Sequence, residues 1–292
     1  MEKYDRMINI EELDKGFDYY NLNYKYKYRC YKCLKEISKN DKFISSFKKV
    51  FKQLNYDDFN SLNKCWNIKN IDEMFCENID PFVTNLLIIL SYNNHEKNMK
   101  KNKLNDKQVL IHKKRVKECF ENDLIKRKYN SIRISQMLWA IYFIRVKIIE
   151  IGRLQYEYFE DEGKQLIKIH IPSGEILAYD KVLDSLKKSG GEIKKIFNIN
   201  DVDYVCNSWL LSNEVNNIIS INCNINKFYK LFNVIEGEEC IDDILNFVYS
   251  LTECNDYGIL SEETSLQKNI KEQLINGVTF KLGKGVLKKE AI

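Results

Sequence analysis

Ile151-Gly-Arg-Leu-Gln-Tyr-Glu-Tyr-Phe159 is a stretch in which polar and apolar side chains alternate, and Leu166-Ile-Lys-Ile-His-Ile171 repeats the pattern. A period of two is typical of β-strands, because successive side chains point to opposite faces of a sheet. Between the two runs, Glu160-Asp-Glu-Gly163 has the composition of a tight turn. The sequence therefore predicts a β-hairpin here.

The predicted hairpin gathers groups that can bind or move protons on one sheet face. With an even turn centred on the Asp-Glu pair, Gln155 lies opposite Lys168 and Arg153 lies opposite His170. A carboxylate or imidazole on this face, Glu157 or His170, can accept a proton from an amine or a hydroxyl. A three-residue turn would shift the register by one residue and scatter the group. The same face can also be the solvated side of a half-buried sheet.

Helices are expected before the hairpin. Apolar residues recur at helical spacing between Phe43 and Leu54, and a nearly all-apolar helix is predicted to start at Pro81 and reach Leu90. The Asn- and Lys-rich segment 93–107 favours an exposed loop. A long helical stretch is predicted over 109–150, with an interruption near 129–131.

Strands and helices alternate after the hairpin. We expect strands over 204–211, 227–235 and 278–287, and helices over 179–197, 242–249 and 264–276. Gly283 and Gly285 are predicted bend points in the last strand. The sum is an α+β chain, in which an all-α N-terminal domain (1–131) is followed by a mixed-sheet domain (132–292).

Composition and charge narrow the function classes. The 292-residue chain is 44% hydrophobic and 30% charged, the balance of a globular protein. Residues 1–150 carry 30 Lys and Arg against 20 Asp and Glu, a net charge of +10, whereas residues 151–292 carry 16 against 22, a net charge of −6. A basic half can bind polyanions, but it can also be an ordinary solvated surface. The sequence contains no zinc finger, RNP-like strand or Arg-rich helix, so we do not expect nucleic-acid binding.

A cytoplasmic location without a membrane segment is expected. The first residues carry acids and lack the apolar core of a signal peptide. The apolar run 81–90 is too short to cross a bilayer, and the run 137–151 is interrupted by Arg145 and Lys147. Nine cysteines at irregular spacing fit a reducing compartment.

The cysteines offer two further candidate sites. Cys30-Tyr-Lys-Cys33 is a single CxxC pair without a second pair at zinc-finger spacing, and the histidines are scattered, so no metal site is expected. The role of this pair stays open. Cys206 lies on a predicted strand, where a thiol near His170 can act as a nucleophile, although a strand cysteine is more often a buried small hydrophobe.

Six short segments carry a resemblance to a known family. They are GRLQYE (152–157), HIP (170–172), CNSWLL (206–211), NINKFYKLF (224–232), TSLQ (264–267) and GKG (283–285). In this order they resemble the two-domain bacterial acyltransferases, common in Firmicutes, that join an N-acyltransferase N-terminal domain to a GNAT-like C-terminal domain. The segments lie within residues 150–287, and the N-terminal domain is assigned by its position and helical texture.

The resemblance implies a GCN5-related N-acetyltransferase (GNAT) fold, whose mixed sheet opens between its fourth and fifth strands to receive the thioester of an acyl-CoA. The strand at 204–211 would be the fourth and the strand at 227–235 the fifth. The implied reaction is direct attack on acetyl-CoA or another acyl-CoA by an amine of a small molecule or peptide.

The resemblance also implies roles for individual residues. Glu157 or His170 would be the base, and Arg153 and Gln155 would position the substrate. The backbone near the end of the fourth strand would hold the thioester and the start of the next helix would face the CoA pyrophosphate. The residues concerned are Asn207, Ser208, Trp209, Leu210 and Ser212.

One departure from the family pattern leaves an alternative open. The usual pyrophosphate loop, Arg/Gln-x-x-Gly-x-Gly/Ala, is absent after the strand at 204–211, where Ser212-Asn213-Glu214 places an acid instead. The alternative is a non-catalytic GNAT-fold binding module that has lost CoA, because a fold alone does not fix a function.

Overall fold

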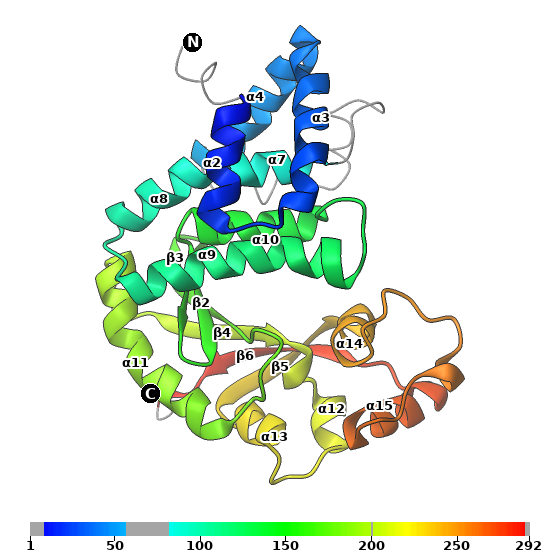
Figure 1. Ribbon diagram of the computed structural model, residues 1–292. Coiled ribbons are helices and arrows are strands. Elements are labelled where there is room, and N and C mark those ends of the chain that lie inside the picture. The colour runs from blue at the N-terminus through cyan, green and yellow to red at the C-terminus, as the bar shows by residue number, and fades with distance from the viewer. Residues whose placement is uncertain (1–8, 57–81, 200, 290–292) are drawn as a thin grey trace. The chain divides into compact units, whose positions relative to one another are not determined.

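The computed structural model describes residues 9–56, 82–199 and 201–289 (Figure 1). The chain divides into two compact units, Met1–Ile149 and Glu150–Ile292. The domain limit at 131/132 stays a prediction. Within the described ranges, no helix has the length and apolar character needed to span a bilayer.

The first unit is built from helices around an apolar core. Its elements are α2 (Ile10–Tyr20), η1 (Tyr24–Tyr26), α3 (Lys27–Ser38), α4 (Asp41–Tyr56), α7 (Val83–Leu90), α8 (Tyr92–Lys101), α9 (Asp106–Phe120), the π-helical η2 (Glu121–Lys126) and α10 (Ile134–Ile144). Every residue of α7 is buried, as its apolar sequence predicts. The predicted helix start at Pro81 lies outside the described residues.

Two predictions for this unit are wrong. The segment expected as a loop over 93–107 is largely helix α8, because Asn94, His95 and Met99 are buried in the unit, so packing outweighs the polar composition. The helical stretch predicted over 109–150 ends early, because residues 148–150 already belong to strand β1 (Ile148–Ile151).

The second unit contains most of a six-stranded sheet of order β1-β2-β3-β4-β6-β5. Its strands after β1 are β2 (Leu154–Asp161), β3 (Lys164–His170), β4 (Asp203–Ser208), β5 (Phe232–Glu239) and β6 (Lys281–Leu287). The pairs β2–β3, β4–β6 and β5–β6 are antiparallel, whereas β3 and β4 are parallel. The sheet is therefore mixed, and Figure 1 shows β6 in red between β4 and β5.

The helices of the second unit follow the predicted order. They are α11 (Tyr179–Phe197), η3 (Trp209–Leu211), α12 (Asn213–Asn217), α13 (Asn224–Tyr229), α14 (Ile241–Val248), η4 (Tyr257–Ile259) and α15 (Ser265–Ile275). The hairpin, α11, α14 and α15 are confirmed, and Thr264 closes a capping box with Gln267 at the start of α15. Because α11 links β3 to β4, it is the crossover that a parallel pair requires.

Two details of the second unit correct or extend the sequence predictions. The first three residues of the strand expected over 227–235 belong to helix α13, whose start is capped by Cys223 and whose Phe228 is fully buried, and β5 begins only at Phe232. Gly283 and Gly285 both lie within β6, and the pairing of β5 with β6 shifts register between Glu236 and Glu239, beside Gly283. A Cβ on Gly283 would lie 2.0 Å from the Leu211 carbonyl oxygen, so this glycine permits close packing of η3 on the sheet.

Candidate functional site

The hairpin brings the predicted proton-transfer residues together, but in another register. Glu162 and Gly163, with φ of 48° and 80°, form the two-residue turn, so Gln155 pairs with His170 and Glu157 with Lys168. The predicted pairing of Gln155 with Lys168 is wrong by two residues. Because the error is even, every side chain keeps its predicted face.

Glu157 and His170 contact each other directly. They are diagonal neighbours on one face of β2–β3, and His170 Nε2 lies 2.6 Å from Glu157 Oε2. Glu157 is 7% exposed, and His170 is half-buried. A carboxylate in this position fixes the orientation of the imidazole ring and stabilises the imidazolium that forms when the ring accepts a proton. The pair can therefore act as a general base.

Gln155 and Arg153 are buried and bind groups of their own chain. Gln155 Nε2 donates to Glu150 Oε2 at 2.7 Å. Arg153 Nη2 donates to the Glu175 carbonyl at 2.7 Å, and its Nε donates to the Ile176 carbonyl at 3.1 Å. Arg153 thus anchors the loop that leads into α11. The predicted role of both residues in positioning a substrate stays a prediction.

Sequence reasoning missed Glu150 and the Arg153-anchored loop. The helical stretch predicted over 109–150 ends at Glu150, whereas in the structure the run Ile148-Ile149-Glu150-Ile151 forms β1. The sequence feature that could have predicted this strand is the end of the helical spacing at 148–151. Three β-branched isoleucines there surround a single acid, a composition typical of a short strand.

The end of β4 holds the residues expected to bind the thioester. Asn207 is exposed and pairs across the sheet with Lys284, whereas Ser208 Oγ accepts from the Leu210 amide at 3.2 Å. Trp209 and Leu210 belong to η3 rather than to the strand. Only the first two of these residues therefore lie on β4.

Cys206, on the same strand, is fully buried. Burial raises the pKa of its thiol to about 12. A thiolate is the nucleophilic form, so this environment favours the packing role over the nucleophilic one.

Ser212 caps a short helix whose first turn already contains a carboxylate. The Ser212 hydroxyl donates to Glu214 Oε2 at 2.6 Å, and the same carboxylate oxygen accepts from the Lys281 amide at 3.2 Å. α12 has five residues. The bound acid leaves this helix start poorly suited to an anion.

The parallel pair β3–β4 ends its pairing before either strand ends. Pairing covers Leu166–Lys168 and Asp203–Val205, whereas β3 continues to His170 and β4 to Ser208. The opening expected between the strands at 204–211 and 227–235 is wrong, because β6 lies between β4 and β5. Chain order alone could not reveal that the last strand inserts between two earlier ones. His170 therefore lies at the carboxyl end of a parallel pair, where α/β sheets bind ligands.

Cys30 and Cys33, the CxxC pair, are fully buried on α3 and belong to the core of the helical unit. Across the described ranges, no group of three or more His, Cys, Asp or Glu side chains is arranged to hold a metal ion.

Residues 148–287 match the family model of the GNAT-like C-terminal domain. A comparison with curated protein sequences finds no match. The α+β fold, with a helical N-terminal region followed by a GNAT-like mixed sheet, agrees with the fold class that the sequence predicts.

Three solved structures illustrate which proteins share this fold. A mutant acyltransferase in complex with octanoyl-CoA is 12% identical, covering 95% of this chain and 99% of its own, with a TM-score of 0.63. An acyltransferase in complex with decanoyl-CoA and teicoplanin is 13% identical, covering 94% and 99%, with a TM-score of 0.64. An acyltransferase in complex with decanoyl-CoA is 17% identical, covering 71% of this chain and 66% of its own, with a TM-score of 0.64. At these identities the similarity shows the fold alone.

Proposed function

We propose that this protein transfers an acyl group from an acyl-CoA to an amine. The observation that carries the proposal is the Glu157–His170 pair at the carboxyl end of β3, beside the point where β3 and β4 stop pairing. The GNAT-like family match and the acyl-CoA complexes of proteins with a similar fold support it. Neither favours the alternative of a binding module that has lost CoA.

In the proposed reaction the amine nitrogen attacks the thioester carbonyl carbon. The C–N bond forms, the C–S bond breaks, and the sulfur leaves as the thiol of CoA after taking up a proton. His170 accepts a proton from the attacking nitrogen, while Glu157 orients its ring and stabilises the imidazolium. Backbone amides of Asn207 and Ser208, near the end of β4, are candidates for polarising the carbonyl.

We propose that the CoA pyrophosphate binds at the start of α11 rather than of α12. α11 has 19 residues, and the loop before it turns at Gly174, whose φ is 95° and whose Cβ position faces open space. Amides of a first helical turn have no partner within the helix and attract anions. Arg153 would contribute by holding the Glu175 and Ile176 carbonyls of this loop in place.

The acceptor and the acyl chain are proposed as classes only. Similar folds have been solved with octanoyl-CoA, with decanoyl-CoA and with teicoplanin. We therefore propose medium-chain acyl-CoAs, beside acetyl-CoA, as donors, and amines of small molecules or peptides, including glycopeptides of the teicoplanin type, as acceptors. A cytoplasmic location stays a prediction.

The direct test is turnover by the purified full-length chain with acetyl-, octanoyl- or decanoyl-CoA and a panel of amines. Product should be followed by mass spectrometry, because Cys223 and Cys254 are partly accessible and would react with thiol reagents. We expect acylated amine with at least one donor, and a rise in the unfolding midpoint when that donor is added. No stabilisation by any of the three at millimolar concentration would contradict the proposal.

A further inference from the structure

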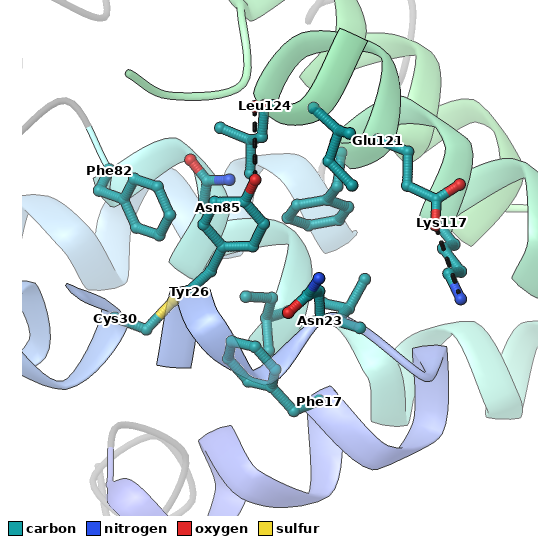
Figure 2. A pocket seen from close by; sticks show the side chains of 13 residues that line it. Phe17, Asn23, Tyr26, Cys30, Phe82, Asn85, Lys117, Glu121 and Leu124 are labelled. Atoms are coloured by element: carbon teal, nitrogen blue, oxygen red, sulfur yellow. Dashed lines mark hydrogen bonds and ion pairs between the residues drawn. The ribbon is translucent and has the colours of Figure 1, made fainter. Parts of the chain in front are cut away.

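The helical unit contains a cavity that is too small to bind an organic ligand. Its volume is about 20 Å³, which is room for about one water molecule. Asn85 is fully buried and lines this cavity beside Phe82 and Tyr26, and its Nδ2 has no hydrogen-bond partner among the described residues (Figure 2). A water molecule can accept a hydrogen bond from this donor, so the cavity has no need of a larger ligand.

One face of the sheet offers a more extended surface, next to the Glu157–His170 pair. Lys168 and His170 are two residues apart on β3 and therefore share this face. Lys168 pairs with Val205 of β4, and Val205 pairs with Val286 of β6. Because paired residues point to the same side of a sheet, the three side chains form a row across β3, β4 and β6. This row begins beside the candidate base.

The row is accessible because α11 packs on the opposite face of the sheet. There, Ser189 Oγ of α11 donates to the hydroxyl of Tyr204 at 3.1 Å. Val205 follows Tyr204 on β4, so its side chain points away from this helix. Val286 is 45% exposed, and Val205 and Lys168 are half-buried. The face therefore presents two valines and one ammonium group to a ligand.

Lys168 is a cation that the chain itself does not neutralise. Across residues 9–56, 82–199 and 201–289, its side chain forms no hydrogen bond or ion pair. Glu157 lies directly opposite it on β2 but contacts His170 instead. Two other lysines of this face are paired with acids, in the ion pairs Lys164–Asp203 at 2.6 Å and Lys284–Glu238 at 2.7 Å. A single half-buried cation matches one carboxylate, whereas a phosphate would leave its second charge unbalanced.

We propose that the acceptor in the proposed reaction is an α-amino acid with an aliphatic side chain. Its carboxylate would bind Lys168 Nζ, its side chain would lie on Val205 and Val286, and its amine would face the His170 ring. Residues two apart on a strand are about 7 Å apart, and hydrogen bonds of about 3 Å at each end leave a gap that the amine and carboxylate of an α-amino acid can fill. This inference rests on the proposed function and narrows its acceptor.

The test compares L-leucine with 3-methylbutylamine, which has the same amine and isobutyl group and lacks the carboxylate. We would measure kcat/KM for both amines on the full-length wild type and on Lys168→Met, with acetyl-, octanoyl- and decanoyl-CoA. The ratio of the two values cancels any change that affects both amines. We expect the ratio of leucine to amine to fall about tenfold or more in Lys168→Met, mainly through KM, because a charge-assisted hydrogen bond is lost for leucine only. Lys168→Arg should keep most of the wild-type ratio.

Two control variants separate the roles of charge and apolar contact. Lys164→Met removes a lysine from the same face of the same strand, and the ratio should stay within about twofold of the wild-type value. Val286→Ser should weaken both amines by about threefold and leave the ratio unchanged, because both carry the isobutyl group. A loss of the ratio in Lys164→Met equal to that in Lys168→Met would mean that the general charge of the face is responsible, and would overturn the inference.

Direct binding distinguishes a failure of this inference from a failure of the proposed function. Dissociation constants for both amines would be measured by ligand-observed NMR in the presence of CoA, which cannot donate an acyl group. If leucine binds more tightly than the amine in the wild type but not in Lys168→Met, and no acylated product forms, acyl transfer is wrong and the amino-acid site stands. If both amines are acylated at a ratio that Lys168→Met leaves unchanged, acyl transfer stands and the inference is overturned. A wild type that neither binds nor acylates leucine also overturns it.

Discussion

The described histidines occupy two kinds of environment. In the helical unit, His95 and His112 are fully buried with ring centroids 5.9 Å apart, and Tyr19, Tyr20 and Phe143 contribute further rings around them. In the sheet unit, His170 is half-buried and contacts the Glu157 carboxylate at 2.6 Å. Burial among rings makes a histidine part of a core, whereas a carboxylate near solvent makes it available for proton transfer.

The largest expected effect concerns the sheet-unit histidine. Glu157→Gln and His170→Asn should each lower kcat by about 100-fold or more, because each removes part of the general base. The dissociation constant for acyl-CoA should stay within about twofold, since neither side chain is expected to contact the CoA. Steady-state kinetics and calorimetric titration would measure the two quantities.

The matched control for these variants is Glu160→Gln, an exposed acid on the same strand. Its kcat should equal that of the wild type. If Glu157→Gln also leaves kcat unchanged, the Glu157–His170 pair is structural. The difference between the two histidine environments then has no consequence for catalysis.

The second prediction concerns acid stability of the helical unit. Burial, together with His112 and Lys113, holds the pKa of His95 well below its ordinary value of 6.5. Below pH 6.5 an unfolded His95 binds a proton that the folded one excludes, so stability is complete above that pH and declines as the pH falls. Between pH 7.5 and 5.5 this one residue should therefore lower the free energy of unfolding by an amount on the order of 1 kcal/mol. Denaturant titrations at pH 7.5 and 5.5 would measure the loss.

His95→Gln provides the comparison for this loss. The variant keeps a polar group beside the Tyr20 hydroxyl, which lies 3.2 Å from His95 Nδ1 in the wild type. It should be less stable at pH 7.5 but should lose less stability on acidification. An unchanged slope with pH would mean that other groups control the acid response.

A smaller effect is expected at the start of α11. Asp180 is an exposed acid in its first turn. If the CoA pyrophosphate binds there, Asp180→Asn should tighten CoA binding by about two- to fivefold at low salt, because it removes a repulsive charge. Calorimetric titration at two salt concentrations would measure it. Equal tightening by Glu214→Gln, at the start of α12, would favour the other helix.

The smallest effect on turnover is expected at Cys206. Its buried thiol, with a pKa of about 12, should resist alkylation by iodoacetamide at pH 7.5 in the folded protein. Cys206→Ala should retain kcat within about twofold and lose some stability from the cavity. Peptide mapping and kinetics would check both. A loss of kcat comparable to that of Glu157→Gln would restore the thiol as a nucleophile.

Local patterns in the sequence predicted the individual helices and strands better than how these elements pack and pair with one another. The alternation at 151–171 predicted the hairpin and its faces. The helical spacing of apolar residues over 179–197 predicted α11, which continues through Gly190-Gly191. α8 was missed because its polar residues are buried by packing that composition does not record. The sheet order was missed because β6 inserts between β4 and β5, a long-range pairing without a local signal. The candidate base followed from the hairpin, whereas the place where β3 and β4 stop pairing could be located only from the sheet order.

The two proposed tasks of the site, accepting a proton and holding the thioester, depend on different parts of the chain. Glu157 and His170 are 13 residues apart and are joined by a two-residue turn, so their contact needs only local folding. The β4 end that would hold the thioester arrives only after the α11 crossover, and β6 reaches it from the far end of the chain. Mutations can therefore remove the binding half of this site while the proton-accepting half stays intact. A descendant of such a chain would keep the pair as an inherited remnant, without a reaction to serve.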